Sequence, residues 1–184
     1  MSAKNKLDPY FTKPEVARYY SEKIKELFGE DNNFIEPSAG EGAFSFNFES
    51  IQSYDLAPRF NSCHKQDFLS KGFLPESGSI FVGNPPFGKN SSLALKFLNK
   101  CCESNAKAVC FILPKTFKKR FFQERVNLSY SVSYEEDVPK NSFLLDGMPY
   151  DVPCVFQIWS PCKRELFNIE NIWFEEVPKS EADF

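Results

Sequence analysis

The positions of apolar residues along the chain predict strands that alternate with helices. Apolar side chains recur at helical spacing between Val16 and Phe28, and Pro14 suits a first helical turn, so we expect a helix over residues 14–28. A second helix is expected over residues 91–102. Short apolar runs bounded by turn residues predict strands at 33–36, 51–55, 79–83 and 108–113, and alternating patterns predict two more at 129–135 and 154–159.

The order of these elements indicates the fold class. Strands separated by helices form parallel sheets, and a final pair of strands joined by a loop adds antiparallel pairing at one edge. We therefore expect one α/β, Rossmann-like domain with a mostly parallel sheet and an antiparallel edge strand. The length of 184 residues fits this domain, which we assign to residues 1–164, followed by a tail over residues 165–184.

Composition narrows the class of protein. A hydrophobic content of 42% and a charged content of 26% are typical of a soluble globular chain. No apolar run approaches the roughly 18 residues that a membrane helix needs, and residues 1–6 lack the apolar core of a secretory signal. We expect a soluble, intracellular protein, cytoplasmic or nuclear, without a membrane partner.

Cysteine and histidine usage argues against a metal site. The six cysteines include no C-x-x-C pair, and His64 is the single histidine of the sequence. Zinc sites need four soft ligands at close spacing or several histidines. We expect no metal, reduced and mostly buried thiols, and a mechanism that does not depend on a histidine base.

The net charge of −3 hides an uneven distribution of charge. Residues 165–184 hold six acidic side chains against one lysine, whereas residues 115–125 hold five basic side chains against one acid. A basic cluster with interleaved aromatic residues can bind phosphate and stack on bases. The same pattern describes a solvated amphipathic helix whose phenylalanines face the core, and composition alone favours that second interpretation.

Three predicted strands end in residues that are typical of ligand sites. In open parallel sheets the ligand lies beyond the carboxyl ends of the strands. The turn over residues 36–42, between a strand and an expected helix, contains glycines that let the backbone approach a ligand closely, although many such turns contain glycine for steric reasons alone. Asp55 ends the next strand, where an acid either binds a ribose diol or caps a turn.

The third strand end, Asn84-Pro85-Pro86-Phe87, is the most informative. Because proline has no backbone N–H, this stretch presents two acceptors in a rigid frame, the Asn84 amide oxygen and the Pro85 carbonyl. An acceptor pair of this kind suits a substrate NH₂ group. Phe87 adds a flat face for a planar ring.

Together these segments resemble the class I S-adenosylmethionine-dependent methyltransferases, and among them the gamma-ordered N6-adenine methyltransferases of DNA and RNA. The resemblance covers about residues 9–120 and implies a seven-stranded class I methyltransferase fold with S-adenosylmethionine as cofactor. It implies a catalytic tetrapeptide at Asn84, Pro85, Pro86 and Phe87. The cofactor-binding residues that it implies are Phe11, Thr12, Glu36, Pro37, Ser38, Ala39, Gly40, Asp55, Leu56, Asp67, Phe68 and Asn84.

The implied reaction is methyl transfer to the N6 amine of an unpaired or flipped adenine in nucleic acid. Phe87 would stack on the base, and Phe143 or Tyr150 could close its other face. The basic side chains of Lys115, Lys118, Lys119 and Arg120 could contact phosphates, while the phenylalanines between them pack.

Three alternatives remain open at this point. One is methylation of a protein glutamine amide by a family that also uses Asn-Pro-Pro, and another is methylation of the guanine N2 amine in RNA. The third is an inactive scaffold subunit, which the intact acids and tetrapeptide disfavour. Because we expect no separate target-recognition domain, a partner protein or a second copy of the chain could complete recognition of the target.

Overall fold

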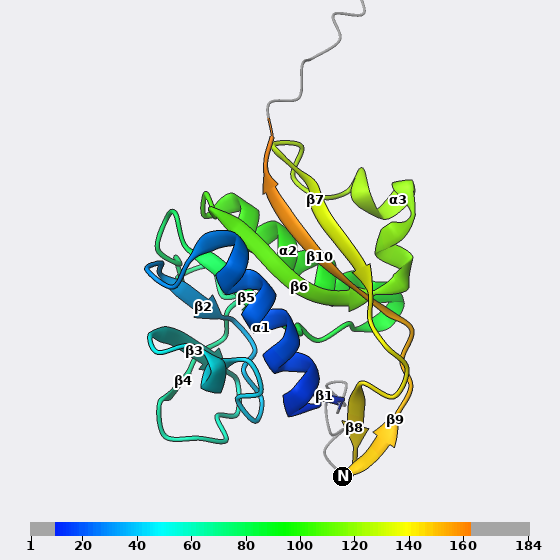
Figure 1. Ribbon diagram of the computed structural model, residues 1–184. Coiled ribbons are helices and arrows are strands. Elements are labelled where there is room, and N and C mark those ends of the chain that lie inside the picture. The colour runs from blue at the N-terminus through cyan, green and yellow to red at the C-terminus, as the bar shows by residue number, and fades with distance from the viewer. Residues whose placement is uncertain (1–9, 163–184) are drawn as a thin grey trace, which may run out of the picture.

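The computed structural model describes residues 10–162, which contain a seven-stranded sheet in the order β4-β3-β2-β5-β6-β10-β7 (Figure 1). The acidic tail expected over 165–184 lies outside the described residues. The strands of this sheet are β2 (Phe34–Glu36), β3 (Ile51–Asp55), β4 (Cys63–Lys65), β5 (Ile80–Gly83), β6 (Ala108–Pro114), β7 (Tyr130–Asp137) and β10 (Cys154–Pro161).

Strand directions confirm the expected Rossmann-like fold. Strands β4, β3, β2, β5 and β6 are mutually parallel, and β10 runs antiparallel to β6 and to the edge strand β7. The chain starts in the middle of the sheet at β2, builds outward to β4, and then returns to β5. The strand order therefore reverses beside β2 and β5, where open sheets of this kind bind their ligands.

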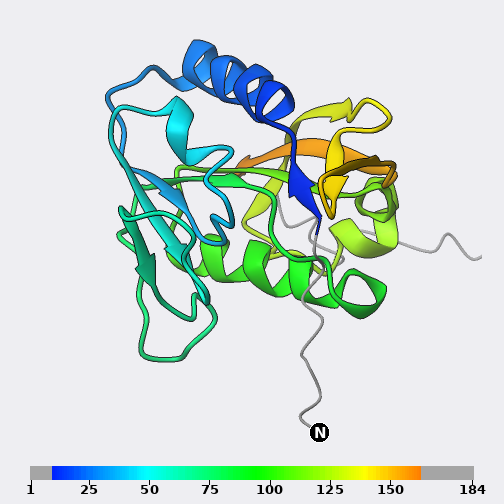
Figure 2. The same cartoon turned by 90° about the horizontal axis from the view of Figure 1, so that it is seen from below.

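Helices cover both faces of the sheet. Helix α1 (Pro14–Phe28) lies on one face and α2 (Ser92–Glu103) on the other (Figure 2). Alternate residues of each central strand point to opposite faces: Ile80 and Val82 pack in the cluster beneath α1, whereas Phe81 packs in the cluster beneath α2. This two-sided burial explains why the central strands read as continuous apolar runs.

A second, three-stranded sheet lies beside the end of the main sheet where α1 begins. It pairs β1 (Phe11–Thr12) with β8 (Phe143–Leu145), and β8 with β9 (Met148–Tyr150). The β8–β9 hairpin turns through Asp146 and Gly147, both with positive φ (50° and 78°), as a tight hairpin turn requires. The hydrophobic pattern indicated only a turn-rich loop here, so this hairpin is a finding of the structure.

Two further segments differ from the sequence expectation. The glycine-containing turn after β2 leads into a single 3₁₀ turn (Ser45–Asn47) where an α-helix was expected. Residues 115–125 form a 3₁₀ turn (Lys115–Lys118) and a one-turn helix α3 (Arg120–Gln123). Elsewhere, a 3₁₀ turn (Lys89–Ser91) precedes α2. Phe117 is completely buried, as expected for packing, but Phe121 is 65% exposed, so the expectation that it packs is wrong.

All six cysteines are free, and Cys162 is the only one of them that is not buried. The expectation of reduced, mostly buried thiols is confirmed. Burial raises the pKa of the Cys102 and Cys154 thiols to about 12, which makes them unreactive.

Candidate active site

A cavity of about 420 Å³ opens at the carboxyl edge of the parallel strands. Its walls come from β1 and from the segments that follow β2, β3, β4 and β5. The structure brings to this one cavity every residue that the sequence leads us to expect in cofactor binding or catalysis: Phe11, Thr12, Glu36, Pro37, Ser38, Ala39, Gly40, Asp55, Leu56, Asp67, Phe68, Asn84, Pro85, Pro86 and Phe87.

The loop after β2 is held in place by the end of β3. One carboxylate oxygen of Asp55 accepts a hydrogen bond from Gly40 N at 2.8 Å, and the other accepts one from Ala57 N at 2.8 Å. Gly40 has φ 54°, a conformation that favours glycine, and a Cβ at this position would lie 3.3 Å from the Phe11 ring, which would have to shift slightly. Asp55 thus fixes two turns while it also lines the cavity.

Glu36, the last residue of β2, is a buried carboxyl group beneath this loop. It is 2% exposed and accepts a hydrogen bond from the Ser45 hydroxyl, which also lies 2.6 Å from the Ser53 hydroxyl. Burial is the main reason why the pKa of Glu36 is raised to about 8. The hydrogen bond from Ser45 lowers this pKa, and the negative charge of Asp55 raises it further. Glu36 is therefore largely neutral at pH 7.

Asn84 follows β5 and presents an unused acceptor. Its amide nitrogen donates a hydrogen bond to the Thr12 hydroxyl at 3.1 Å, and its backbone carbonyl accepts one from the Ser38 hydroxyl at 3.4 Å. The side-chain oxygen Oδ1 is buried and has no hydrogen-bond partner between residues 10 and 162. Buried polar atoms without partners are costly, by about 1–3 kcal/mol, and so call for an explanation.

The rest of the tetrapeptide is anchored to helix α2. The Phe87 carbonyl accepts hydrogen bonds from Leu93 N at 3.1 Å and Ala94 N at 3.3 Å, which satisfies two amides at the start of the helix. Gly88 has φ 66°, and a Cβ there would lie only 2.7 Å from that of Leu93. The backbone that carries Phe87 is thereby fixed, while the Phe87 ring is part of the cavity wall.

Asp67 and Phe68, after β4, form a further part of the wall. The Phe68 ring is 2% exposed and stacks on Phe97 of α2, with ring centroids 5.4 Å apart. Asp67 is exposed and accepts a hydrogen bond from Leu69 N at 2.9 Å through Oδ1. An apolar ring face beside an accessible carboxylate suits a planar ligand that carries an amine.

Sequence reasoning missed Arg59 and Glu41, which line the cavity. The Arg59 guanidinium lies 4.5 Å from the centre of the Phe11 ring and pairs with Glu41 at 3.1 Å. This contact joins the segments after β2 and β3 to β1. The sequence holds no local signal for it, because the three residues are brought together only by the fold.

The two aromatic residues expected to close the site lie in different places. Phe143 is completely buried in the core cluster beneath α1 and does not line the cavity. Tyr150 is 41% exposed and stacks on Tyr10, with ring centroids 5.1 Å apart and an angle of 12° between the rings. Tyr10, not Tyr150, is the member of this pair that lines the cavity.

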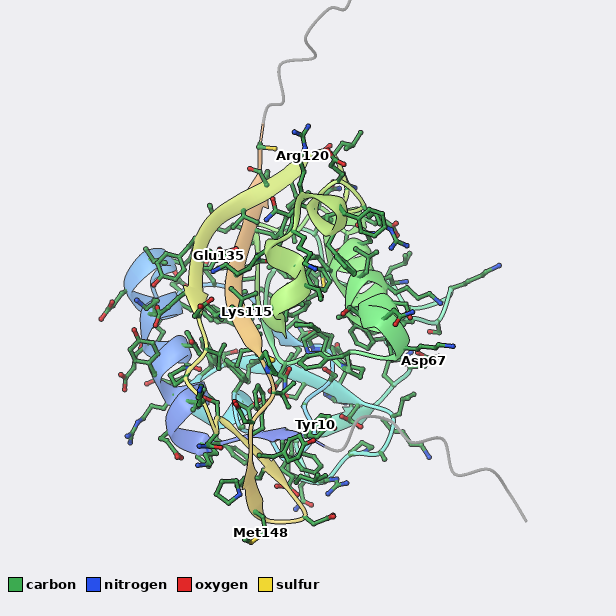
Figure 3. All side chains as sticks on the ribbon, turned by 90° about the vertical axis from the view of Figure 1, so that its right-hand side faces the viewer. Tyr10, Asp67, Lys115, Arg120, Glu135 and Met148 are labelled. Carbon is green, nitrogen blue, oxygen red and sulfur yellow. The ribbon has the colours of Figure 1, made fainter. Side chains whose placement is uncertain are left out.

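The basic stretch after β6 is largely paired with acids. Lys115 and Lys118 form ion pairs with Asp137 at 2.7 and 2.9 Å, and Lys118 also pairs with Glu135. Arg120 pairs with Glu124 at 2.6 Å. None of the residues Lys115, Lys118, Lys119 and Arg120 lines the cavity, and in Figure 3 Arg120 lies at the opposite end of the molecule from Met148, with Tyr10 near the Met148 end.

Between residues 10 and 162, no helix is long and apolar enough to span a bilayer. The same residues contain no group of three or more histidine, cysteine, aspartate or glutamate side chains that could hold a metal ion.

No model of a known protein family matches this sequence. The chain is 26% identical over 155 residues to the protein ENHANCED DOWNY MILDEW 2 of Arabidopsis thaliana. That match covers 75% of this chain but only 12% of the plant protein. The chain thus corresponds to a small part of this relative.

Several solved structures of methyltransferases share the fold. A candidate RNA methyltransferase of Pyrococcus horikoshii superimposes with a TM-score of 0.64 at 15% identity, over 84% of this chain and 87% of that one. A modification subunit of a candidate type I restriction enzyme from Vibrio vulnificus gives 0.62 at 11% identity, over 86% and 46%. The N1-methyltransferase of 1,6-didemethyltoxoflavin from Burkholderia thailandensis, solved with S-adenosylhomocysteine, gives 0.56 at 8% identity, over 81% and 79%. The chain has the Rossmann-like fold of the class I methyltransferases.

Proposed function

We propose that this chain transfers a methyl group from S-adenosylmethionine to the exocyclic N6 amine of an adenine in DNA or RNA. The observation that carries the proposal is that Asn84, Pro85, Pro86 and Phe87 together line the cavity, while the buried Oδ1 of Asn84 has no hydrogen-bond partner between residues 10 and 162. An acceptor that is left without a partner inside a binding site is best explained by a donor on the substrate. The solved relatives, which include a candidate RNA methyltransferase and a modification subunit, support a nucleic acid as the substrate.

The cavity residues fit the proposed cofactor. Each oxygen of Asp55 already accepts one backbone N–H and retains a second lone pair, so the carboxylate can accept two ribose hydroxyls. Asp67 uses Oδ1 for Leu69 N, which leaves Oδ2 for the cofactor's adenine amine, with Phe68 beside the ring. When bound, S-adenosylmethionine supplies an electrophilic methyl group.

The residues of the tetrapeptide prepare the amine. An exocyclic aromatic amine is a weak nucleophile because its lone pair is delocalised into the ring. Asn84 Oδ1 and the Pro85 carbonyl would accept its two N–H bonds and favour a more tetrahedral nitrogen with a localised lone pair. Phe87 would hold the ring in place, so that positioning supplies much of the acceleration. As the nitrogen bonds to the methyl carbon, the bond between that carbon and the cofactor's sulfur would break, and the methylated nitrogen would release one proton to water.

The cavity can accept only a base that is outside a double helix. An adenine that is stacked inside a duplex cannot enter a cavity in the protein, so the target base is unpaired or flipped out. Because the expected phosphate contacts of Lys118 and Arg120 compete with ion pairs to Glu135, Asp137 and Glu124, we propose modest affinity for nucleic acid alone. A partner protein or a second copy of the chain would then strengthen target recognition.

The experiment separates binding from chemistry. Asn84→Ala should retain cofactor affinity, measured by calorimetry, and lose methyl transfer to single-stranded substrate by at least about a hundred-fold. Asn61→Ala is the matched control, because Asn61 is exposed and does not line the cavity. Near wild-type transfer by Asn84→Ala would overturn the proposed role of this residue.

A further inference from the structure

The proposed cofactor carries charges that the cavity has to match. S-adenosylmethionine has a positive sulfonium, and its amino-acid end has a positive ammonium and a negative carboxylate. Among residues 10–162, Arg59 is the single lysine or arginine that lines the cavity, so it is the basic side chain available to the carboxylate. Of the acids on the wall, Asp55 and Asp67 are assigned to the ribose and to the adenine amine, and Glu36 is largely neutral. Glu41 then remains for the ammonium.

The order of the strands indicates where the amino-acid end lies. Strands β4, β3, β2 and β5 are neighbours in the sheet (Figure 1). The proposed function puts the adenine at Asp67 after β4, the ribose at Asp55 after β3, and the methyl group at Asn84 after β5. Because the ribose and the methyl group occupy the strands on either side of β2, we expect the amino-acid end at the carboxyl end of β2. The loop that follows β2 contains Glu41.

Arg59 belongs to the segment after β3, but its guanidinium lies at this loop. It pairs with Glu41 at 3.1 Å and lies 4.5 Å from the centre of the Phe11 ring. Contact with an aromatic ring restrains a guanidinium and leaves its N–H groups for hydrogen bonds. Of its five N–H donors, one is bonded within residues 10–162, to Glu41. The side chains of Arg59 and Glu41 are 53% and 55% exposed and both line the cavity, so a ligand can reach them.

We propose that Arg59 and Glu41 bind the amino-acid end of S-adenosylmethionine, Arg59 through the carboxylate and Glu41 through the ammonium. The inference rests on the proposed function, because it requires this cofactor in the cavity. An arginine paired with a glutamate presents opposite charges side by side, which matches the adjacent ammonium and carboxylate of an amino acid. Such charge-assisted hydrogen bonds are stronger than those between neutral groups.

The same two residues could instead serve only to hold the loop after β2 against β1. Three ligands separate the two roles. S-adenosylmethionine carries both the ammonium and the carboxylate, decarboxylated S-adenosylmethionine retains the ammonium alone, and 5′-methylthioadenosine has neither but keeps the adenine and the ribose. A residue with a purely structural role would affect the binding of all three ligands alike.

Calorimetry would measure the affinity of each ligand for the wild type, Arg59→Ala and Glu41→Gln. The matched control is Arg125→Ala: the Arg125 guanidinium lies 5.4 Å from the centre of the Phe121 ring, but Arg125 does not line the cavity. This control should bind all three ligands as the wild type does.

Each variant should lose affinity only for the ligands that carry its partner group. We expect Arg59→Ala to weaken binding of S-adenosylmethionine by about ten-fold, and not to weaken binding of the other two ligands. Glu41→Gln should weaken binding of decarboxylated S-adenosylmethionine by about five-fold or more and leave that of 5′-methylthioadenosine unchanged.

Three results would contradict the inference in different ways. Equal weakening of all three ligands by Arg59→Ala would show that Arg59 only holds the loop, and unchanged affinity for S-adenosylmethionine would remove Arg59 from the site. Circular dichroism would show whether the variants are folded, and if Arg59→Ala is not, Arg59→Gln repeats the test with a planar amide beside the Phe11 ring. A wild type that binds none of the three ligands would instead overturn the proposed cofactor itself.

Discussion

The buried carboxyl group of Glu36 should give the protein a pH-dependent stability that one substitution removes. Glu36 is 2% exposed, and burial raises its pKa to about 8, whereas an unfolded glutamate titrates near 4.5. Between these two values the folded state keeps a proton that the unfolded state releases. The stabilisation from Glu36 is therefore fully present below pH 4.5 and is lost as the pH rises through about 8.

The magnitude follows from the proton difference. A full proton changes the free energy of unfolding by about 1.4 kcal/mol per pH unit, so this group would lower stability by up to about 3 kcal/mol between pH 5 and pH 7. In Glu36→Gln the amide oxygen still accepts the Ser45 hydroxyl, and no charge is buried at any pH. Urea unfolding followed by circular dichroism at pH 5, 6, 7 and 8 should show a stability that depends less on pH in the variant.

The control is Glu49→Gln, which removes an exposed glutamate and should leave the pH dependence of the wild type unchanged. Parallel pH profiles for the wild type and Glu36→Gln would refute the reasoning. That result would mean that Glu36 titrates in the folded protein as it does in the unfolded chain.

Three further variants test separate parts of the site. Asp55→Ala should weaken cofactor binding by about ten-fold or more, because it removes an ionised acceptor and frees the loop that it holds; unchanged affinity in calorimetry would remove Asp55 from the cofactor site. Replacement of Lys118, Lys119 and Arg120 by alanine should weaken nucleic-acid binding equally across sequences. Two of these residues are already paired with acids. We therefore expect the slope of log binding constant against log salt concentration to fall by about one instead of three. An unchanged slope would mean that these basic residues form a solvated surface and do not bind phosphates. Phe87→Ala should raise the apparent KM for nucleic acid with little effect on cofactor affinity, whereas Phe87→Tyr should be tolerated; equal loss in both variants would argue against stacking.

Elements with a strong local pattern were predictable from the sequence. The central strands bury both faces and so appear as unbroken apolar runs, as in Ile80–Gly83. Helix α1 has an apolar face, a proline in its first turn and a glycine after its last residue. Asp55 and Asn84 could be predicted as site residues because they lie at strand ends, and ligands bind at the carboxyl edge of a parallel sheet.

Elements that depend on distant contacts were not predictable. Strand β4 (Cys-His-Lys) has one apolar residue, and β9 (Met-Pro-Tyr) has three residues with a proline in the middle, so neither gives a recognisable strand pattern. The segment between β2 and β3 forms a 3₁₀ turn over Ser45–Asn47 where an α-helix was expected. The ion pairs of Lys115 and Lys118 depend on acids of the edge strand β7, which the local sequence around 115–125 does not contain.

The identity of the methylated atom tests the central claim most directly. The full chain would be incubated with methyl-labelled S-adenosylmethionine and with separate pools of RNA, single-stranded DNA and duplex DNA, alone and beside Asn84→Ala. Mass spectrometry of the digested nucleosides should find the label on the N6 amine of adenine, most of it in an unpaired substrate, and none with Asn84→Ala. Label on the guanine N2 amine or on a glutamine side chain of protein, with none on adenine, would contradict the account.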